Sequence, residues 1–519
     1  MAKRHLGSPR WRGILSPSIV FIVITLLAFA NLATWSLTDP LVSAPDEQSH
    51  IITAVARDHF SVATPTAGNK VTVTVTVPAS IAYTTVYPDC WHFYTQIPAT
   101  CSQPFPTSQT PTLITTYTDH YPPLYYTLVG VASWFSETTG GIYAMRLISS
   151  LLGALMLGLA AYAIAKWSRR RGLWLGVVAS LTPLTWFLSS SVNPSGFEIM
   201  TAICFWTLIA IWGLDHPDEV PRRLATWVGV VASVFVLIRG LSPLWVGLGA
   251  LSLLTLVGPV RLFRQVRESR HLQIVAGSVF LLTLVATAWI ITQGTLNILP
   301  VGAPVTKNAS LLTILHDVLG TVQFWIRESV GVLGWVDTTL PHEVYLAWYF
   351  VIPLILVVAL LRGQWNQRIV VAALAGLAVA IPVTLVTLHA RQLGVVWQGR
   401  DSMPLAVGAV IMASAVATPV VTRAKHVVQL AEVAMTGGLI ALFSWENALS
   451  FYTNLRRYAV GRDGPATFFL HHLGWSPPIG QVGSLVLDVL FTGAFAGVII
   501  VWLWFTQPKS RSHSSPRLR

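Results

Sequence analysis

Charged residues are scarce in this chain. Only 10% of its 519 residues are Asp, Glu, Lys or Arg, whereas soluble proteins carry about 25%. Hydrophobic residues make up 53% of the chain, and its mean hydropathy is +0.62. So few charges cannot cover a surface that faces water, but helices that face lipid need none. The composition therefore excludes a soluble globular protein and indicates a membrane protein.

Two further absences narrow the function. The net charge of +12 is not gathered in a basic stripe with interleaved aromatic residues, so we do not expect nucleic acid as a partner. The 14 histidines and three cysteines show no metal-ligand spacing, so the sequence predicts no metal site from them.

Apolar runs long enough to cross a bilayer core, about 20 residues each, occur twelve times. The expected spans are 14–36, 142–165, 173–190, 197–213, 224–239, 241–260, 272–293, 344–361, 369–388, 405–421, 427–445 and 481–505. We therefore predict an all-α polytopic membrane protein with about twelve transmembrane helices, of which all but the first lie in a helical domain at 142–505.

The predicted loops differ sharply in charge. Lys and Arg resist translocation, so loops that are rich in them stay in the cytoplasm. If every span is real, 22 of the 33 cations fall in loops on one side, which include the N-terminus at 1–13 and a basic tail at 506–519. We therefore predict that both termini are cytoplasmic.

The opposite side carries the long polar loops, at 37–141, 294–343, 389–404 and 446–480. In the first loop, VTVTVTV at 71–77 alternates Val with Thr, which predicts a half-buried strand in a small β element. Cys90 and Cys101 lie in the same loop, outside the reducing cytosol, and are candidates for a disulfide. Residues 310–328 have helical spacing and predict a helix on the outer membrane surface, with a short extra membrane helix as the alternative.

An acidic motif, APDEQSH at 44–50, follows the first span directly. Pro45 suits the start of a helix, and Asp46 and Glu47 fall in its first turn, where the helix dipole favours carboxylates. His50 shares a face with both acids. This cluster could act as a general base or bind a cation, although the two acids could also merely cap a surface helix.

Five further motifs lie near the predicted outer ends of helices, namely YPPLYY (121–126), AMRLISSLLGAL (144–155), SSSVNPSG (189–196), LGWVDTTLP (333–341) and QGRDSMPL (398–405). Together with APDEQSH, in this order, they resemble a bacterial membrane family, domain-of-unknown-function family 2142. That family is similar to the GT-C glycosyltransferases. Two departures from the family pattern are Asp401 after the Arg of QGR, where an aromatic residue is frequent, and Ser195 in place of an Asp.

The resemblance implies a GT-C-like fold in the cytoplasmic (inner) membrane. It also implies a catalytic carboxylate in the first outer loop, which falls on Asp46 with Glu47 beside it, and a sugar donor carried on polyprenyl phosphate. No cofactor is certain, but some GT-C enzymes use a divalent cation, so Mg²⁺ or Mn²⁺ could be held by Asp46, Glu47 or Asp58.

Sugar transfer needs a base, a group that stabilises the leaving phosphate, and a surface that binds the sugar. Asp46 is the expected base. Arg400 is the first candidate for the phosphate, followed by Arg391, Arg146 and His50. The expected sugar contacts are Trp335, Asp337, Tyr121, Tyr125, Asn193 and Gln398.

Simpler explanations remain open for several of these residues. Arg400 could form a surface ion pair with Asp401, and Trp335 could belong to an interfacial aromatic belt. Arg239 and Glu198 lie near membrane level, where snorkelling to the interface explains them as well as function does.

The predicted function is therefore transfer of a hexosyl or pentosyl group from a polyprenyl-phosphate donor to an envelope glycan, lipid or protein on the outer side, with membrane lipids as the surrounding partner. The main alternative is a secondary transporter or a lipid or polysaccharide flippase, for which twelve helices are equally natural. A non-catalytic scaffold for envelope assembly is a third hypothesis.

Overall fold

The computed structural model describes residues 16–66, 72–297, 308–418, 426–471 and 474–506. The predicted cytoplasmic segment 1–13 and nearly all of the predicted basic tail lie outside these residues. The helices, in chain order, are α2 (Pro17–Thr38), α3 (Glu47–Asp58), α4 (Ala79–Ala82), α5 (Leu124–Gly130), α6 (Thr139–Trp167), α7 (Gly172–Ser180), α8 (Pro183–Ser189), α9 (Pro194–Asp215), α10 (Arg222–Val236), α11 (Ser242–Val257), α12 (Pro259–Glu268), α13 (Arg270–Gln293), α14 (Leu311–Gly331), α15 (His342–Arg362), α16 (Trp365–Leu393), α17 (Gly399–Ala417), α18 (His426–Val460) and α19 (Gln481–Phe505).

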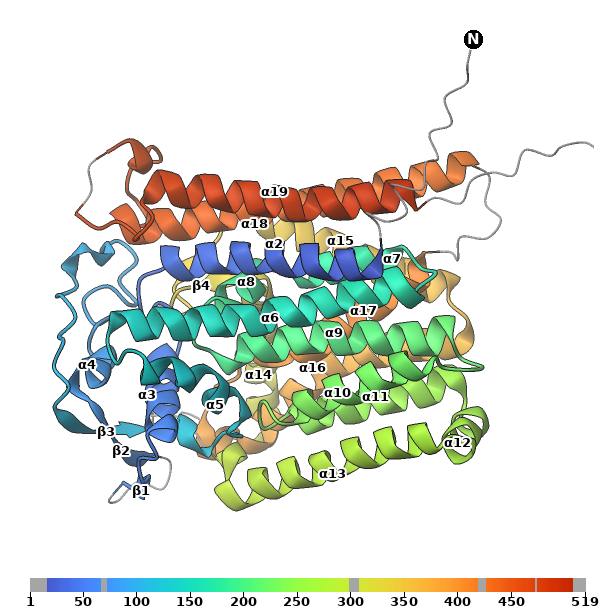
Figure 1. Ribbon diagram of the computed structural model, residues 1–519, viewed down its shortest axis with the longest axis horizontal. Coiled ribbons are helices and arrows are strands. Elements are labelled where there is room, and N and C mark those ends of the chain that lie inside the picture. The colour runs from blue at the N-terminus through green and yellow to red at the C-terminus, as the bar shows by residue number, and fades with distance from the viewer. Residues whose placement is uncertain (1–15, 67–71, 298–307, 419–425, 472–473, 507–519) are drawn as a thin grey trace, which may run out of the picture.

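The long helices run nearly side by side along one direction (Figure 1). α9 is the central helix, because the whole of its most apolar stretch is buried against α6, α10, α11 and α17. α13 lies at the periphery, with only 11% of its apolar window buried. A helix that is apolar on all sides and yet exposed in the isolated chain is expected to face lipid. The predicted fold class, an all-α polytopic membrane protein, is thereby confirmed.

Each of the twelve predicted spans corresponds to helix, but fewer are long and apolar enough to cross a membrane. Among the described residues there are eight such helices, or up to ten if two bent pairs each form one span. α10 has only 15 residues. The two bent pairs are α7 with α8, at 64°, and α11 with α12, at 104°. The predicted count of about twelve is therefore larger than the structure supports by this criterion.

A small antiparallel sheet lies at one end of the helical bundle (Figure 1). Its strands are β1 (Thr64–Pro65), β2 (Val73–Pro78) and β3 (Pro111–Thr116), in that order, with Val75 opposite Ile114. Val73, Val75 and Val77 are buried and the threonines between them are more exposed, as the alternation predicts. A second pair, β4 (Val332–Leu333) with β5 (Thr338–Thr339), follows α14.

Two further predictions for the polar loops are met. Cys90 and Cys101 form a disulfide. Residues 310–328 form most of α14, which packs against α16 and α17; its depth relative to a membrane stays a prediction.

The cation-rich loops meet at the end of the bundle opposite the sheet. Arg170 pairs with Asp215 at 3.2 Å and donates a hydrogen bond to the carbonyl of Ala415 at 3.1 Å. Arg171 donates to the carbonyl of Thr506, just beyond α19. Loops that the charge count assigns to one side of the membrane therefore do lie together, and we call this the cationic end.

Candidate active site

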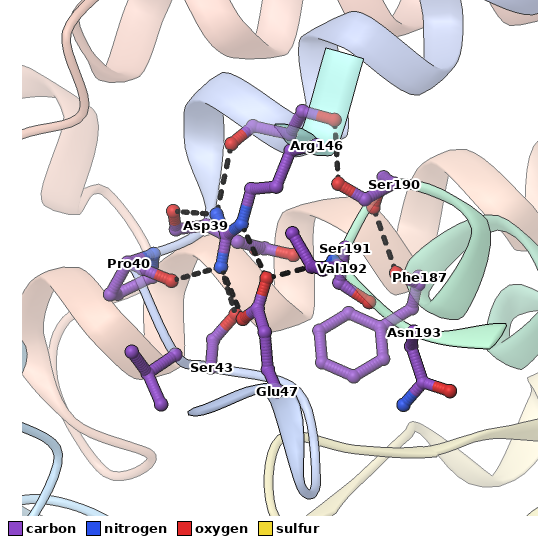
Figure 2. Close-up of polar contacts among 12 residues, drawn as sticks. Asp39, Pro40, Ser43, Glu47, Arg146, Phe187, Ser190, Ser191, Val192 and Asn193 are labelled. Carbon is purple, nitrogen blue, oxygen red and sulfur yellow. Dashed lines mark hydrogen bonds and ion pairs between the residues drawn. The ribbon is translucent and has the colours of Figure 1, made fainter. Parts of the chain in front are cut away.

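A buried ion pair holds the acidic motif against the bundle (Figure 2). Arg146 of α6 donates to both carboxylate oxygens of Glu47, each at 2.7 Å, and neither side chain has appreciable exposure. The backbone N–H of Val192 donates to Glu47 Oε1 at 3.0 Å. The remaining donors of Arg146 reach three carbonyls just after and at the end of α2, those of Ser36, Asp39 and Pro40. The pair therefore joins the ends of α2, α6 and the α8–α9 turn to the start of α3.

This geometry changes the expected roles of Glu47 and Arg146. A fully buried carboxylate whose oxygens are all engaged has no access to a substrate. We therefore assign Glu47 a structural role in place of the catalytic one expected from the sequence. Arg146 likewise positions the motif and does not bind the substrate. Asn193 belongs to the same support, because its side-chain amide donates to the carbonyl of Pro45 at 3.1 Å.

Asp46 points away from this support and forms an ion pair with Arg400, at the start of α17. Its backbone is in the left-handed region, with φ of +66°, which is unfavourable by about 1–2 kcal/mol for residues other than glycine. Its side chain keeps 30% exposure, in contrast to Glu47. Burial alone would raise the pKa of the Asp46 carboxyl, but Arg400, a hydrogen bond with Tyr117 and the proximity of His50 together lower it. Asp46 is therefore an ionised, accessible carboxylate.

A second cluster of charges lies beside this pair. Arg239, between α10 and α11, reaches Glu198 of α9 at 3.2 Å and Asp401 at 3.0 Å. Ser242 donates to the other oxygen of Glu198 at 2.7 Å. Asp401 directly follows Arg400, so the two ion-pair clusters are adjacent along α17. Ion pairs therefore connect the start of α9, the turn between α10 and α11, and the start of α17, which are far apart in the sequence.

These groups border a cavity of about 430 Å³. Its polar wall contains Glu198, Arg239 and Asp401, and its remaining lining is largely apolar and aromatic, with Tyr121, Trp245, Leu296, Val386, Val396 and Trp397. Asp46 lies next to this wall, since it interacts electrostatically with Tyr121, as does Asp401. A cavity with charged groups on one side and apolar surface on the other fits an amphiphile with a polar head.

The aromatic residues of the YPPLYY motif surround the site. Tyr121 lines the cavity and lies under the guanidinium of Arg239, with 5.8 Å between them. The hydroxyl of Tyr126 is 2.9 Å from Nδ1 of His50. Burial lowers the pKa of His50 to about 3, against the opposing effect of Asp46, so this imidazole is neutral at neutral pH. Tyr125 is buried, with its hydroxyl 3.0 Å from that of Ser149, and lies outside the cavity.

Three further residues expected at the site lie elsewhere. Asp337 accepts from the backbone N–H of Phe93 at 2.9 Å and is 3.6 Å from Arg457. Trp335 donates to the carbonyl of Val42 at 2.9 Å and packs against the disulfide-closed loop. Their expected role as sugar contacts is therefore corrected, because both secure the loop between Cys90 and Cys101 to the bundle.

The third displaced residue is Arg391, which is exposed and donates to the carbonyl of Ala309. It does not line this cavity, and its expected role in phosphate binding stays a prediction. Gln398 does lie at the site, at the N-cap of α17, and its backbone N–H donates to Asp401 at 3.3 Å.

Arg239, Glu198 and Asp401 were not among the residues expected to bind substrate. One signal could have identified them: each lies at a predicted outer helix end, and charges of both signs at the same depth in lipid are expected to pair.

Neither acid of the motif fits a divalent cation. Asp46 faces the guanidinium of Arg400 and Glu47 that of Arg146, and each guanidinium occupies the place a cation would take. Within the described part of the chain, no three His, Cys, Asp or Glu side chains are grouped so that they could hold a metal ion.

Comparisons with known proteins identify a family. The family described as "Predicted membrane protein (DUF2142)" matches residues 29–409, which is most of the chain. No curated protein sequence matches significantly. Among solved structures, the crystal structure of ArnT from Cupriavidus metallidurans bound to undecaprenyl phosphate is similar over 94% of this chain and 76% of that one, with 15% identity and a TM-score of 0.39.

Proposed function

The chain belongs to the DUF2142 family of membrane proteins, and we propose that it is a glycosyltransferase that moves a sugar from a polyprenyl-phosphate donor to a cell-envelope acceptor. The observation that carries the proposal is the pairing of Asp46 with Arg400 beside an amphiphilic cavity, at the predicted outer end of the bundle. A carboxylate base and a guanidinium that binds phosphate are the two charged groups that such a transfer needs.

The pair suggests how the reaction is controlled. While Arg400 holds Asp46, the carboxylate has a lowered pKa and is a weak base. A donor phosphate that binds Arg400 replaces the carboxylate as its partner, and Asp46 regains basicity. Asp46 then accepts the proton of the acceptor hydroxyl while the hydroxyl oxygen forms its bond to C1 of the sugar. The bond from C1 to the phosphate oxygen breaks, and its electron pair leaves on the phosphate, which Arg400 stabilises.

The cavity lining supports a sugar next to this pair. Tyr121, Trp245 and Trp397 offer flat surfaces against which the apolar faces of a pyranose or furanose ring can pack. Asp401 and Glu198 offer oxygens that accept hydrogen bonds from sugar hydroxyls. Arg239 fixes both carboxylates in place.

A second, largely apolar cavity supports a lipid-linked donor. It has a volume of about 740 Å³ and lies between α7, α14, α15, α16 and α17. Ser402 lines it and accepts a hydrogen bond at 2.9 Å from Trp397, which lines the polar cavity. A prenyl chain in this second cavity would leave its phosphate near the start of α17.

The test is a strain that lacks the chromosomal gene and carries the wild-type chain, Asp46→Asn or Asp215→Asn. Asp215 pairs with an arginine at the cationic end, so its variant also loses an ion pair but leaves the cavity unchanged. We expect Asp46→Asn to accumulate the lipid-linked sugar and to lack the envelope modification, at normal membrane levels of protein. The strain with Asp215→Asn should carry the envelope modification in proportion to the amount of that variant in its membrane. The measurement is mass spectrometry of lipid-linked sugars and envelope glycans.

A transporter or flippase is separated from the enzyme by purified protein. Liposomes that contain the accumulated donor and an envelope extract should yield product with the wild-type chain but not with Asp46→Asn. Movement of an intact lipid or solute across the bilayer, with no new glycosidic bond, would contradict the enzymatic proposal.

A further inference from the structure

α12 differs from every other helix near it in direction and in burial. It follows α11 after Gly258, whose φ is +91°, and is turned by 104° from α11. None of its ten residues is buried. It lies at the cationic end and crosses the direction of α13 (Figure 1). Because α11 runs along the bundle, a helix turned by about a right angle at its end lies along the membrane surface.

One side of α12 is held by the protein. Leu262 and Val266 pack against the hydrophobic core. The side-chain amide of Gln265 donates to the carbonyls of Pro217 and Asp218, at 2.8 Å each. These contacts fix the rotation of the helix about its axis, and therefore which residues point outward.

The outward side combines apolar and cationic residues. Val260 and Phe263 are 71% and 69% exposed, and Arg264 and Arg267 are also exposed. At about 100° per residue these four lie within one sector of about 100°, with Leu262 on the far side of the helix and Glu268 about 40° beyond Arg264, just outside the sector. We call these four residues the outward face of α12.

The neighbourhood of this face indicates what it meets. Its neighbour α13 is the least buried of the candidate spans. α11, which ends just before Val260, also has exposed leucines, such as Leu251 and Leu254. The face therefore lies at the rim of the lipid-facing surface. Apolar side chains that insert beside arginines that stay at the headgroup level are the pattern of an interfacial helix.

We propose that the outward face of α12 docks on anionic phospholipid of the leaflet at the cationic end, with Phe263 and Val260 among the acyl chains and Arg264 and Arg267 on the lipid phosphates. Charge complementarity selects anionic lipid, since the negative potential of such a surface attracts arginine side chains near it. This surface is separate from the proposed active site, at the opposite end of the bundle.

The test uses the full-length chain with a nitroxide label in bilayers. Cys204 is buried and Cys90 is paired with Cys101, so a label attaches selectively to Phe263→Cys, or to Glu268→Cys as the reference, which lies about 140° around the helix from residue 263. Collision of the label with oxygen, compared with a water-soluble nickel complex, reports its depth. In bilayers with about a third phosphatidylglycerol, we expect the oxygen-to-nickel ratio to be several-fold higher at residue 263 than at 268. The difference should shrink in phosphatidylcholine alone.

Matched charge variants identify the groups responsible. Arg264→Gln with Arg267→Gln should bring the ratio at residue 263 down to that in phosphatidylcholine. Arg169→Gln with Arg261→Gln also removes two exposed cations from the same end, but not from the outward face, and should leave the ratio unchanged. Equal ratios at 263 and 268 in both bilayers would overturn membrane docking. Recognition of anionic lipid by this face would be overturned if the ratio at residue 263 were the same with and without phosphatidylglycerol. It would also be overturned if both double variants lowered that ratio equally.

Discussion

Asp46 and Glu47 are neighbours in the sequence but occupy opposite environments. Glu47 is sealed with Arg146, whereas Asp46 is partly exposed beside the cavity. We expect Glu47→Gln to destabilise the chain by about 3–5 kcal/mol, because it leaves a buried guanidinium without its countercharge. Asp46→Asn should cost far less stability and remove activity. Thermal unfolding of both purified variants checks this, and equal destabilisation by the two would contradict the assigned roles.

Burial of His50 makes the stability of the folded chain depend on pH. Its pKa falls from 6.5 to about 3 in the folded chain because burial disfavours the charged imidazole. The folded state therefore binds a proton less readily than the unfolded one. The stability that a neutral His50 gives the folded state is therefore fully present above pH 6.5 and is lost as the pH falls towards 3. In detergent, thermal unfolding between pH 7 and pH 4 should show a steeper loss of stability for the wild type than for His50→Gln. Parallel curves would contradict a buried neutral His50.

The two adjacent acids also show what sequence could reveal about single residues. The pairing of Asp46 with Arg400 was within reach, because both motifs lie at predicted outer helix ends. The different environments of Glu47 and Asp46 could not be predicted from the sequence. They depend on the left-handed backbone of Asp46 and on Arg146, which lies about a hundred residues away. Local spacing on an assumed regular helix could not include either.

At the level of elements, the start of α17 is held by α14. The backbone N–H of Gly399 donates to Glu328 at 2.7 Å, and a Cβ at Gly399 would lie 2.4 Å from the carbonyl oxygen of Trp325. We expect Gly399→Ala to push α14 from α17, to cost about 1–3 kcal/mol and to lower transfer by moving Arg400. Thermal unfolding and the transfer assay measure both effects.

Gly376 of α16 is the matched control, because a Cβ there meets nothing within 4 Å. Gly376→Ala should be neutral or stabilising by up to about 1 kcal/mol. If Gly399→Ala behaved in the same way, the tight contact between α14 and α17 would not matter for the site.

Elements were predicted well where one periodicity dominates. The Val–Thr alternation of β2 and the apolar runs of α2, α6 and α9 have one physical explanation each. The bends between α7 and α8 and between α11 and α12 were missed. α7 and α8 read as one continuous apolar run, and their break depends on local features such as Pro183. α12 follows the predicted span at 241–260 as an arginine-rich segment, and its turn away from α11 depends on the positive φ of Gly258.

For the whole molecule, the separation of charge predicts its orientation. The small sheet that contains β3 and the proposed site lie at one end, and the arginine-rich loops at the other (Figure 1). We expect Leu113→Cys on β3 to react with a membrane-impermeant maleimide on spheroplasts, and Asp218→Cys to react only after permeabilisation. Both positions are exposed, and the three native cysteines are buried or paired.

This orientation decides whether the proposed chemistry is accessible to its substrates. An envelope acceptor is present only outside the cytoplasmic membrane, so Asp46 must share the side of Leu113. The wild-type chain should remain unlabelled before and after permeabilisation, which sets the background. Labelling of Asp218→Cys alone on spheroplasts would place the cationic end outside. Asp46 and Arg400 would then face the cytoplasm, and transfer to an envelope acceptor at this site would be excluded.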